Sequence, residues 1–237
     1  MRPSITIVIP IHNEAEFLAD AVERLITEMA AVDADLRILL AENGSKDDTP
    51  AIADRMAQQH ERLDVIHLPE PNYGAAMRAG FQQATGEWVV NFDIDYFSGD
   101  FLRSALALAD EADIVLASKR TEGADDRRGV LRRLGTLGFN IVLKILFQSR
   151  VSDTHGMKMV RRAVAVELVP AVISNLDLFD TELVIRAERA GYRIAEVPAV
   201  VEELREARSS YLSRVPRTLV GLWRIRRSLW RQRSASK

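Results

Sequence analysis

Five short apolar runs rich in β-forming residues alternate with segments of helical periodicity in the first half of this chain. The apolar runs are residues 5–10, 36–41, 63–68, 87–92 and 113–118, and helical segments lie near 14–31, 48–59, 74–84 and 100–110. Strands that alternate with helices form mostly parallel sheets, and nearly continuous apolar strands fit a sheet that is covered on both faces. The sequence therefore predicts an α/β fold.

The second half of the chain is less regular. Helical patterns occur at 129–147, 161–168 and 179–191, a turn-rich segment covers 148–160, a strand is expected at 193–201, and a helix is expected from 210 onward. No internal repeat is visible. We expect one domain, residues 1–209, followed by a C-terminal amphipathic helix and tail, 210–237.

Composition excludes several classes of protein. The chain has no cysteine, so it can form neither disulfides nor thiolate zinc sites, and none of its four histidines are paired at metal-ligand spacing. No apolar run reaches the roughly 18 residues of a transmembrane helix. The N-terminus lacks the pattern of a signal peptide. These features predict a cytoplasmic protein.

Polar loops follow four of the predicted strands. They read PIHNEAE, ENGSKDDT, PEPNYGAAMRAG and DIDY. Ligands of open α/β sheets bind outside the carboxyl ends of the strands, so these loops predict a site for a polar ligand. Local structure offers alternatives: Asn13 as a helix N-cap, a Gly-Ser turn and a helix of small residues. Separately, Asp100 is expected to cap segment 100–110.

Asp93 and Asp95 place two like charges one residue apart after an apolar run. If they flank Ile94 at a strand end, both side chains point to the same side, because strand side chains alternate. Burying unpaired charges is costly, so a counter-charge is expected. Hard divalent cations take oxygen ligands and commonly bridge carboxylates to phosphates.

The four loops together resemble family 2 glycosyltransferases of the GT-A fold. The resemblance begins in IVIPIHNEAEFL, continues through NYGAAMRAGFQQATGEWVVNFDIDYF and reaches FDTELVIRAERAGYRIAEVPAVVEE, nearly the whole chain. The later segments are most similar to polyprenyl-phosphate glycosyltransferases of the dolichyl-phosphate mannose synthase type. The resemblance implies a mixed, mostly parallel sheet flanked by helices, with a nucleotide-sugar half at about 1–120 and an acceptor half at about 121–209.

The resemblance implies that Asp93 and Asp95 hold Mg2+ or Mn2+ on the diphosphate of a nucleotide sugar. Asp95 would be the stronger ligand, and Asp93 would contact the metal or the ribose. The residues that it assigns to donor nucleotide binding are Pro10, Asn13, Glu14, Glu42, Gly74, Arg78, Asp93, Lys119 and Arg120. The family usually has Asp-Asp where this chain has Glu42-Asn43, which leaves the base, uracil or guanine, open. A solvated charge pair is the alternative for Lys119 and Arg120.

Asp180 and Glu182 match the segment where the family places its acceptor-side carboxylate, and with Asp95 they are the predicted catalytic residues. The alternative for Asp180 is a helix N-cap. The predicted ligands of an acceptor phosphate are Arg132, Arg133, Lys158, Arg205 and Arg208. A phosphate acceptor is already anionic and needs no strong base, so positioning and charge neutralisation would carry most of the catalysis. His155 is expected to be a local hydrogen-bonding group.

Two segments predict a peripheral membrane contact. Segment 134–147 is strongly apolar, and 212–233 combines leucines and tryptophans with arginines, which suits a surface of anionic lipid. Residues 202–237 carry ten basic and three acidic residues, whereas the preceding residues are acidic overall. The alternatives are a buried core helix for 134–147, and packing across the domain or in a homo-oligomer interface for 212–233. Nucleic acid is not an expected partner, because the body of the chain is acidic.

The sequence thus predicts a metal-dependent, inverting glycosyltransferase. Its donor would be a nucleoside-diphosphate sugar of the GDP-mannose or UDP-glucose type, and its acceptor polyprenyl or dolichyl phosphate at the inner face of the membrane. Two alternatives stay open: a soluble acceptor, such as a glycan, metabolite or aglycone, and a non-catalytic nucleotide-sugar-binding protein. A nucleotidyltransferase is disfavoured, because no glycine-rich basic loop follows the first strand.

Overall fold

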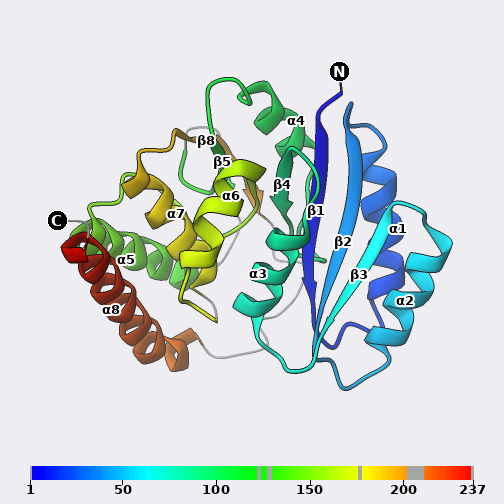
Figure 1. The fold of residues 1–237 in the computed structure, drawn as a ribbon, viewed down its shortest axis with the longest axis horizontal. Helices are drawn as coiled ribbons and strands as arrows, with labels where there is room; N and C mark the ends of the chain where they lie inside the picture. The colour runs from blue at the N-terminus through cyan, green and yellow to red at the C-terminus, as the bar shows by residue number, and fades with distance from the viewer. Residues whose placement is uncertain (1, 122–123, 127–129, 176–177, 202–210, 236–237) are drawn as a thin grey trace.

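A twisted seven-stranded sheet forms the centre of the protein (Figure 1). The computed structural model describes residues 2–121, 124–126, 130–175, 178–201 and 211–235. In spatial order the strands are β3 (Leu63–Leu68), β2 (Asp35–Asn43), β1 (Ser4–Ile11), β4 (Trp88–Asn91), β7 (Lys158–Arg161), β5 (Ile114–Ser118) and β8 (Ile194–Pro198). All neighbours pair in parallel except β7, which runs antiparallel to both β4 and β5. The expected mixed, mostly parallel sheet is confirmed.

Strand β7 corrects one expectation, because its residues belong to a segment that was predicted as turns. It lies between β4 and β5 and pairs through the short register from Trp88↔Arg161 to Asn91↔Lys158. The predicted strand at 193–201 is divided into β8 and β9 (Val200–Val201), and β9 forms a separate two-stranded sheet with β6 (Asp125–Asp126).

The helices occupy the predicted segments. They are α1 (Leu18–Met29), α2 (Thr49–Gln59), α3 (Tyr73–Gln83), α4 (Gly99–Ala107), α5 (Val130–Phe147), α6 (Arg162–Leu168), α7 (Phe179–Ala190) and α8 (Tyr211–Ala235), with a 3-10 turn η1 (Val169–Ala171). Two predicted caps are wrong. Ser98 caps α4 by accepting from the Phe101 N–H, and Asp100 lies inside the first turn. Asn13 lies in a loop with φ of 52°, before α1 begins.

Alternation along β1 sends its side chains into two cores. Ile5, Ile7 and Ile9 join the cluster that includes buried residues of α1, α2 and α4, whereas Val8 joins the cluster with α3, α6 and α7. Because side chains i and i+2 of a strand share a face, this pattern shows a sheet covered on both faces. The apolar strands therefore need both helix layers, as the sequence predicted.

A third apolar cluster joins α5, α7 and α8 at the side of the sheet (Figure 1). Leu222 and Ile225 of α8 are fully buried there against Leu143 of α5 and Ile185 of α7. The C-terminal helix thus packs across the domain, which was one of the predicted alternatives. Among the described residues, no helix is both long and apolar enough to cross a membrane.

Candidate active site

The loops that follow β1 and β2 are held together by hydrogen bonds. The Asn13 N–H donates to Ser45 Oγ at 2.9 Å, and the Lys46 N–H donates to Asn13 Oδ1 at 2.9 Å. The Glu14 N–H donates to Thr49 Oγ1 at 2.7 Å. These bonds cross more than 30 residues of sequence and fix one wall of the site at the carboxyl ends of the strands. Pro10 lies just before this wall, in β1.

Glu42 is buried near the end of β2, and both of its carboxylate oxygens contact other residues of the protein. Its Oε1 accepts from the Ser45 N–H at 2.6 Å, across a turn in which Gly44 has a φ of 63°. Its Oε2 lies 3.3 Å from His67 Nδ1. Burial lowers the pKa of His67, but hydrogen bonds from its ring to Asp54 and Glu42 outweigh this and raise the pKa above its usual value. The carboxylate therefore shapes the loop in which a base contact was predicted.

Asp93 and Asp95 lie in a tight turn just beyond β4. The Asp93 N–H donates to the Tyr96 carbonyl at 3.2 Å, and the Tyr96 N–H donates back at 3.0 Å. Ile94 is buried in the core beneath the turn. The premise that both aspartates flank a strand residue is wrong, because β4 ends at Asn91. The turn still presents both carboxylates at this edge of the sheet, with Asp93 exposed and Asp95 half-buried.

Four charged side chains act on Asp93: the carboxylates of Asp180 and Asp95 and the ammonium groups of Lys158 and Lys119. Protein atoms that displace water around the carboxylate raise the pKa of Asp93 to about 6, together with the negative charge of Asp180. The positive charge of Lys158 opposes this rise. Asp93 keeps access to solvent, and water therefore screens part of the repulsion from its neighbours. A bound cation would favour the ionised form of this carboxyl group.

Asp180 is the centre of a buried polar cluster. Tyr73 Oη donates to Asp180 Oδ2 at 2.6 Å, and the Lys158 ammonium lies 2.9 Å from Asp180 Oδ1. The same ammonium donates to Asn91 Oδ1 at 2.8 Å and to the Gly156 carbonyl at 2.7 Å. The N-cap alternative for Asp180 is wrong, because α7 begins one residue earlier and its cap residue is Leu178. The side chain instead joins α7 to the start of α3 and to β7.

Lys158 was predicted to bind an acceptor phosphate, and it lies fully buried beside the site. With three partners in the cluster, its ammonium is positioned to hold Asp180 rather than to reach a ligand. Its role in binding the acceptor stays a prediction. Tyr73 was not predicted as a site residue, because its partner Asp180 is 107 residues away and no local pattern connects them.

Glu182, the other predicted catalytic carboxylate of α7, is fully buried. It accepts from the Ile173 and Ser174 N–H groups and from Ser174 Oγ, at distances from 2.6 to 3.1 Å. It also pairs with Arg186 at 2.6 Å, and Arg186 donates to Gln232 of α8 at 2.9 Å. These contacts favour a structural role for Glu182 and connect α8 to the 172–175 loop.

Gly74 and Arg78 of α3 pack against the same 172–175 loop. The Gly74 N–H donates to the Asn175 carbonyl at 3.2 Å, and a Cβ at Gly74 would lie 2.7 Å from the Asn175 backbone. Arg78 donates to the Val172 carbonyl at 2.6 Å and to Asn175 Oδ1 at 3.1 Å. Both residues were predicted to approach the nucleotide, and in the structure they fix the helix that carries Tyr73.

Lys119 lies after β5, as predicted, and faces Asp153. Its ammonium is 3.5 Å from Asp153 Oδ2, a buried oxygen without a hydrogen-bond partner in the described part of the chain. Asp153 Oδ1 accepts from the His155 N–H at 2.9 Å, and burial lowers the pKa of the His155 ring. Arg120 points to solvent. Asp153 was not singled out by the sequence, because nothing in SDTHG predicts its burial.

The side chains of the four other predicted phosphate ligands are outside the described part of the chain. Arg205 and Arg208 fall in 202–210, outside the described residues. Arg132 and Arg133 belong to α5, but their side chains are also outside the description.

The donor set at the 93–96 turn fits a divalent cation that a substrate also binds. No group of three or more His, Asp or Glu side chains suited to a metal occurs among the described residues. Two carboxylates do not complete a shell of about six oxygens, so diphosphate and water would supply the remaining ligands. This arrangement is typical of Mg2+, which is bound by one or two carboxylates together with substrate phosphates.

Comparison with known proteins identifies the family. A model described as Glycosyl transferase family 2 matches residues 6–169. The chain belongs to this family. The glycosyltransferase AglD of Haloferax volcanii is 30% identical over 207 residues, which cover 82% of this chain and 32% of AglD. The dolichyl-phosphate beta-glucosyltransferase ALG5C of Trichomonas vaginalis is 26% identical over 219 residues, covering 86% of this chain and 65% of ALG5C.

A solved structure with a similar fold agrees with this assignment. The mannosyltransferase PcManGT of Pyrobaculum calidifontis, solved with GDP-Man and Mn2+, superposes with a TM-score of 0.64. It is 23% identical, and the match covers 92% of this chain and 61% of PcManGT. The predicted family, enzyme class and GT-A-like fold are thus confirmed.

Proposed function

We propose that the protein transfers a sugar, with inversion, from a nucleoside-diphosphate sugar to a polyprenyl or dolichyl phosphate. The observation that carries this proposal is that the 93–96 turn begins two residues after Asn91, a member of the Asp180 cluster through Lys158, beside the interlocked loops after β1 and β2. One side of this edge offers carboxylates for a cation-bound diphosphate. The other side offers a carboxylate held in place by Tyr73 and Lys158.

On the donor side, two backbone hydrogen bonds hold the 93–96 turn, which carries Asp93 and Asp95. A divalent cation bound there would neutralise charge on the departing nucleoside diphosphate. The complex of PcManGT with GDP-Man and Mn2+ supports this assignment. The loops carrying Asn13, Glu14 and Glu42 form the adjoining wall, where the nucleoside would bind.

On the acceptor side, the role of Asp180 depends on the chemistry of the acceptor. If the acceptor is a hydroxyl, Asp180 would take its proton. If the acceptor is a phosphate, Asp180 and Lys158 orient the surrounding groups and no proton is removed. The similarity to ALG5C supports a lipid phosphate.

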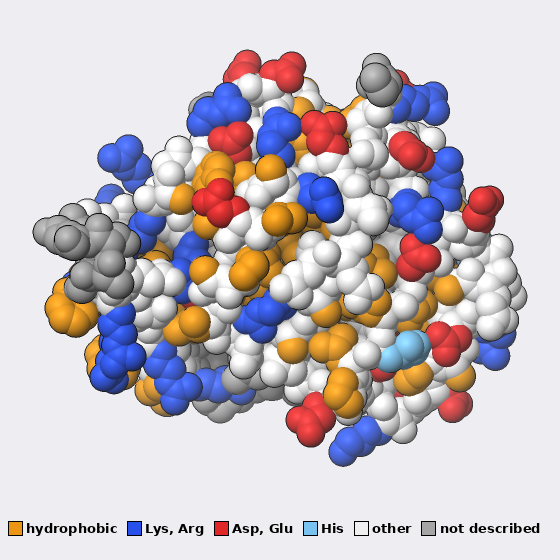
Figure 2. Space-filling model, viewed as in Figure 1, with side chains coloured by type: hydrophobic (Ala, Val, Ile, Leu, Met, Phe, Trp, Pro, Cys, Tyr) orange, Lys and Arg blue, Asp and Glu red, His pale blue; other side chains and the backbone are white. Residues whose placement is uncertain are grey.

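We further propose that α5 and α8 contact a membrane surface that carries anionic lipid. Trp223 and Trp230 of α8 are 58% and 68% exposed, and Ile145 of α5 is 71% exposed. Figure 2 shows Lys and Arg side chains beside hydrophobic ones at the lower left, where α8 lies in Figure 1. Tryptophan and arginine on one helix surface suit the headgroup region of a bilayer. The predicted location at the inner membrane face belongs to this proposal.

The test is turnover of a panel of UDP- and GDP-sugars with Mn2+, with and without a short-chain polyprenyl phosphate. Release of UDP or GDP that depends on the lipid would support both donor and acceptor. Slow release that is unchanged by lipid would point to a soluble acceptor. Absence of donor binding would overturn the roles of Asp93 and Asp95.

A further inference from the structure

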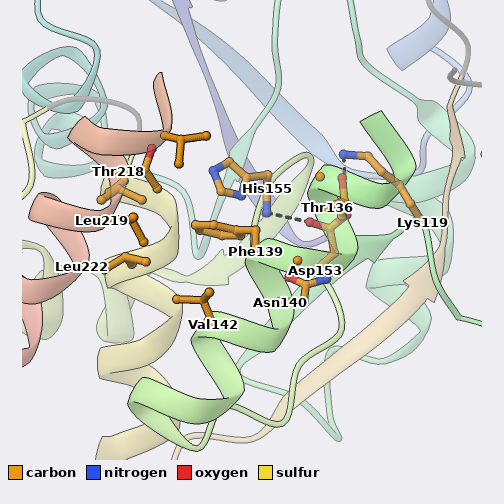
Figure 3. A pocket seen from close by; sticks show the side chains of 14 residues that line it. Lys119, Thr136, Phe139, Asn140, Val142, Asp153, His155, Thr218, Leu219 and Leu222 are labelled. Carbon is orange, nitrogen blue, oxygen red and sulfur yellow. Dashed lines mark hydrogen bonds and ion pairs between the residues drawn. The ribbon is translucent and has the colours of Figure 1, made fainter. Parts of the chain in front are cut away.

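A cavity of about 460 Å³ lies between α5 and α8, beside the active site. Figure 3 shows Phe139 and Val142 of α5 on one side and Leu219 and Leu222 of α8 on the other. Leu178 also contributes to its lining. The volume is within the range of pockets that enclose a drug-sized ligand. We call this space the α5–α8 cavity.

One end of the α5–α8 cavity is polar. Lys119, Asp153 and His155 line it there, and His155 lies edge-on to Phe139 with ring centres 5.1 Å apart (Figure 3). The contact of Lys119 with Asp153 is 3.5 Å, longer than a good hydrogen bond, which leaves the ammonium donors for another anion. The Asp153 carboxylate would repel that anion, so Lys119 has to lie between the two.

The polar end adjoins the catalytic carboxylates. Gly156 lies between the two: a Cβ at Gly156 would lie 3.8 Å from the Lys119 ammonium, and the Gly156 carbonyl accepts from the Lys158 ammonium at 2.7 Å. The Lys158 ammonium in turn lies 2.9 Å from Asp180 Oδ1. A ligand with its anionic head at Lys119 would therefore present that head to the site of transfer, while its apolar part extends between the helices.

We infer that the α5–α8 cavity binds the phosphate-proximal part of a prenyl chain, with the phosphate beside Lys119. The inference rests on the proposed function and adds the place where the acceptor chain binds. It makes α8 a wall of the acceptor site, in addition to any contact that the helix makes with a bilayer. A membrane is not required for this binding, so it is measurable with a short acceptor in solution.

Leu219 and Val220 provide a matched pair for the test. They are neighbours on α8 and equally exposed, at 50% and 51%, but only Leu219 lines the cavity. Leu219→Arg would place a charge in the cavity, whereas Val220→Arg would place the same charge outside it. Thermal unfolding of both variants checks that the fold is kept, and Leu219→Gln with Val220→Gln is a milder pair if either arginine variant is unstable.

The measurement is the Kd of farnesyl phosphate by calorimetry, without membrane or detergent, for the wild-type protein and both variants. We expect Leu219→Arg to weaken binding at least about tenfold, and Val220→Arg to change it less than about twofold. Farnesol should compete with farnesyl phosphate, and inorganic phosphate at the same concentration should not. Equal Kd values for the two variants, or equally tight binding of inorganic phosphate, would overturn the inference.

Different results would contradict the cavity inference and the proposed function. If farnesyl phosphate is glycosylated equally by wild type, Leu219→Arg and Val220→Arg, the cavity inference is wrong and the proposed function stands. If the wild-type protein transfers sugar only to an acceptor without a prenyl phosphate, both are wrong. Binding of UDP or GDP with Mn2+ should be the same in all three proteins, which controls for damage to the donor site.

Discussion

Replacing Lys158 by methionine tests how strongly Lys158 and Asp180 depend on each other for stability. Lys158 and Asp180 are both buried, with side chains 1% and 6% exposed, and the ammonium lies 2.9 Å from the carboxylate. Removing one partner of a buried ion pair leaves an uncompensated charge and typically costs about 3–5 kcal/mol. In a domain of this size that loss would lower the Tm by roughly 6–20 °C.

The coupling is obtained from the free energy of unfolding in urea of four proteins: wild type, Lys158→Met, Asp180→Asn and the double variant. Asp180→Asn leaves Lys158 its bonds to Asn91 and Gly156, so we expect a smaller loss of about 1–3 kcal/mol. The double variant buries neither charge, and its loss should be smaller than the sum of the single losses by about 1–3 kcal/mol. Losses that add to within about 0.5 kcal/mol would refute the reasoning, because they would show that the two charges do not depend on each other.

Three further predictions test other parts of the site. Asp95→Asn should reduce sugar transfer more than about 100-fold and abolish the effect of Mn2+ on GDP or UDP binding. The free energy of unfolding should stay within about 0.5 kcal/mol of the wild-type value. Unchanged Mn2+ dependence would show that Asp95 is not a metal ligand. Gly74→Ala should lower the free energy of unfolding by about 1–3 kcal/mol, because its Cβ would lie 2.7 Å from the Asn175 backbone. Gly138→Ala, whose Cβ would meet no atom within 4 Å, should raise it by about 0.5–1 kcal/mol. Equal effects in calorimetry would contradict the packing argument. The pKa of His67 is raised in the folded state, so protonation stabilises the fold below its unfolded pKa and this contribution is lost as the pH rises through the folded pKa. His67→Gln should therefore cost a few tenths of a kcal/mol more at about pH 5.5 than at about pH 8.5, a small difference because the ring is partly exposed; a larger cost at the higher pH would show that the sign is wrong.

The strands and helices that local patterns specify were predictable from the sequence. Apolar runs such as 5–10 and 87–92 are typical of strands covered on both faces, and the polar loops after them identified the right edge of the sheet. Strand β7 was not predictable in this way. Its first residue is Lys158, which reads as an exposed cation, and its burial depends on Asp180 and Asn91 from distant parts of the chain.

The roles of individual polar side chains depend on contacts that the sequence does not encode locally. Glu182 and Arg78 stand at positions that suggested chemistry, yet both hold the 172–175 loop. Asp180 resembled a helix cap because it precedes an apolar periodic run, but the helix begins one residue earlier and the carboxylate points at Tyr73. The cap is Leu178, two residues before Asp180, and two residues correspond to a rotation of about 200° around the helix axis.

The position of β7 has a consequence for the synthesis of the protein. Strand β4 pairs with β1 on one side, but its partner on the other side follows about 67 residues later in the chain. At a translation rate of about 5–20 residues per second, β4 would leave the ribosome with an unpaired edge for roughly 3–13 s. An exposed strand edge is a template for pairing with other chains. Newly made protein is therefore most prone to aggregate while the segment from β4 to β7 is being translated. Chaperones that bind apolar segments would matter most in that interval.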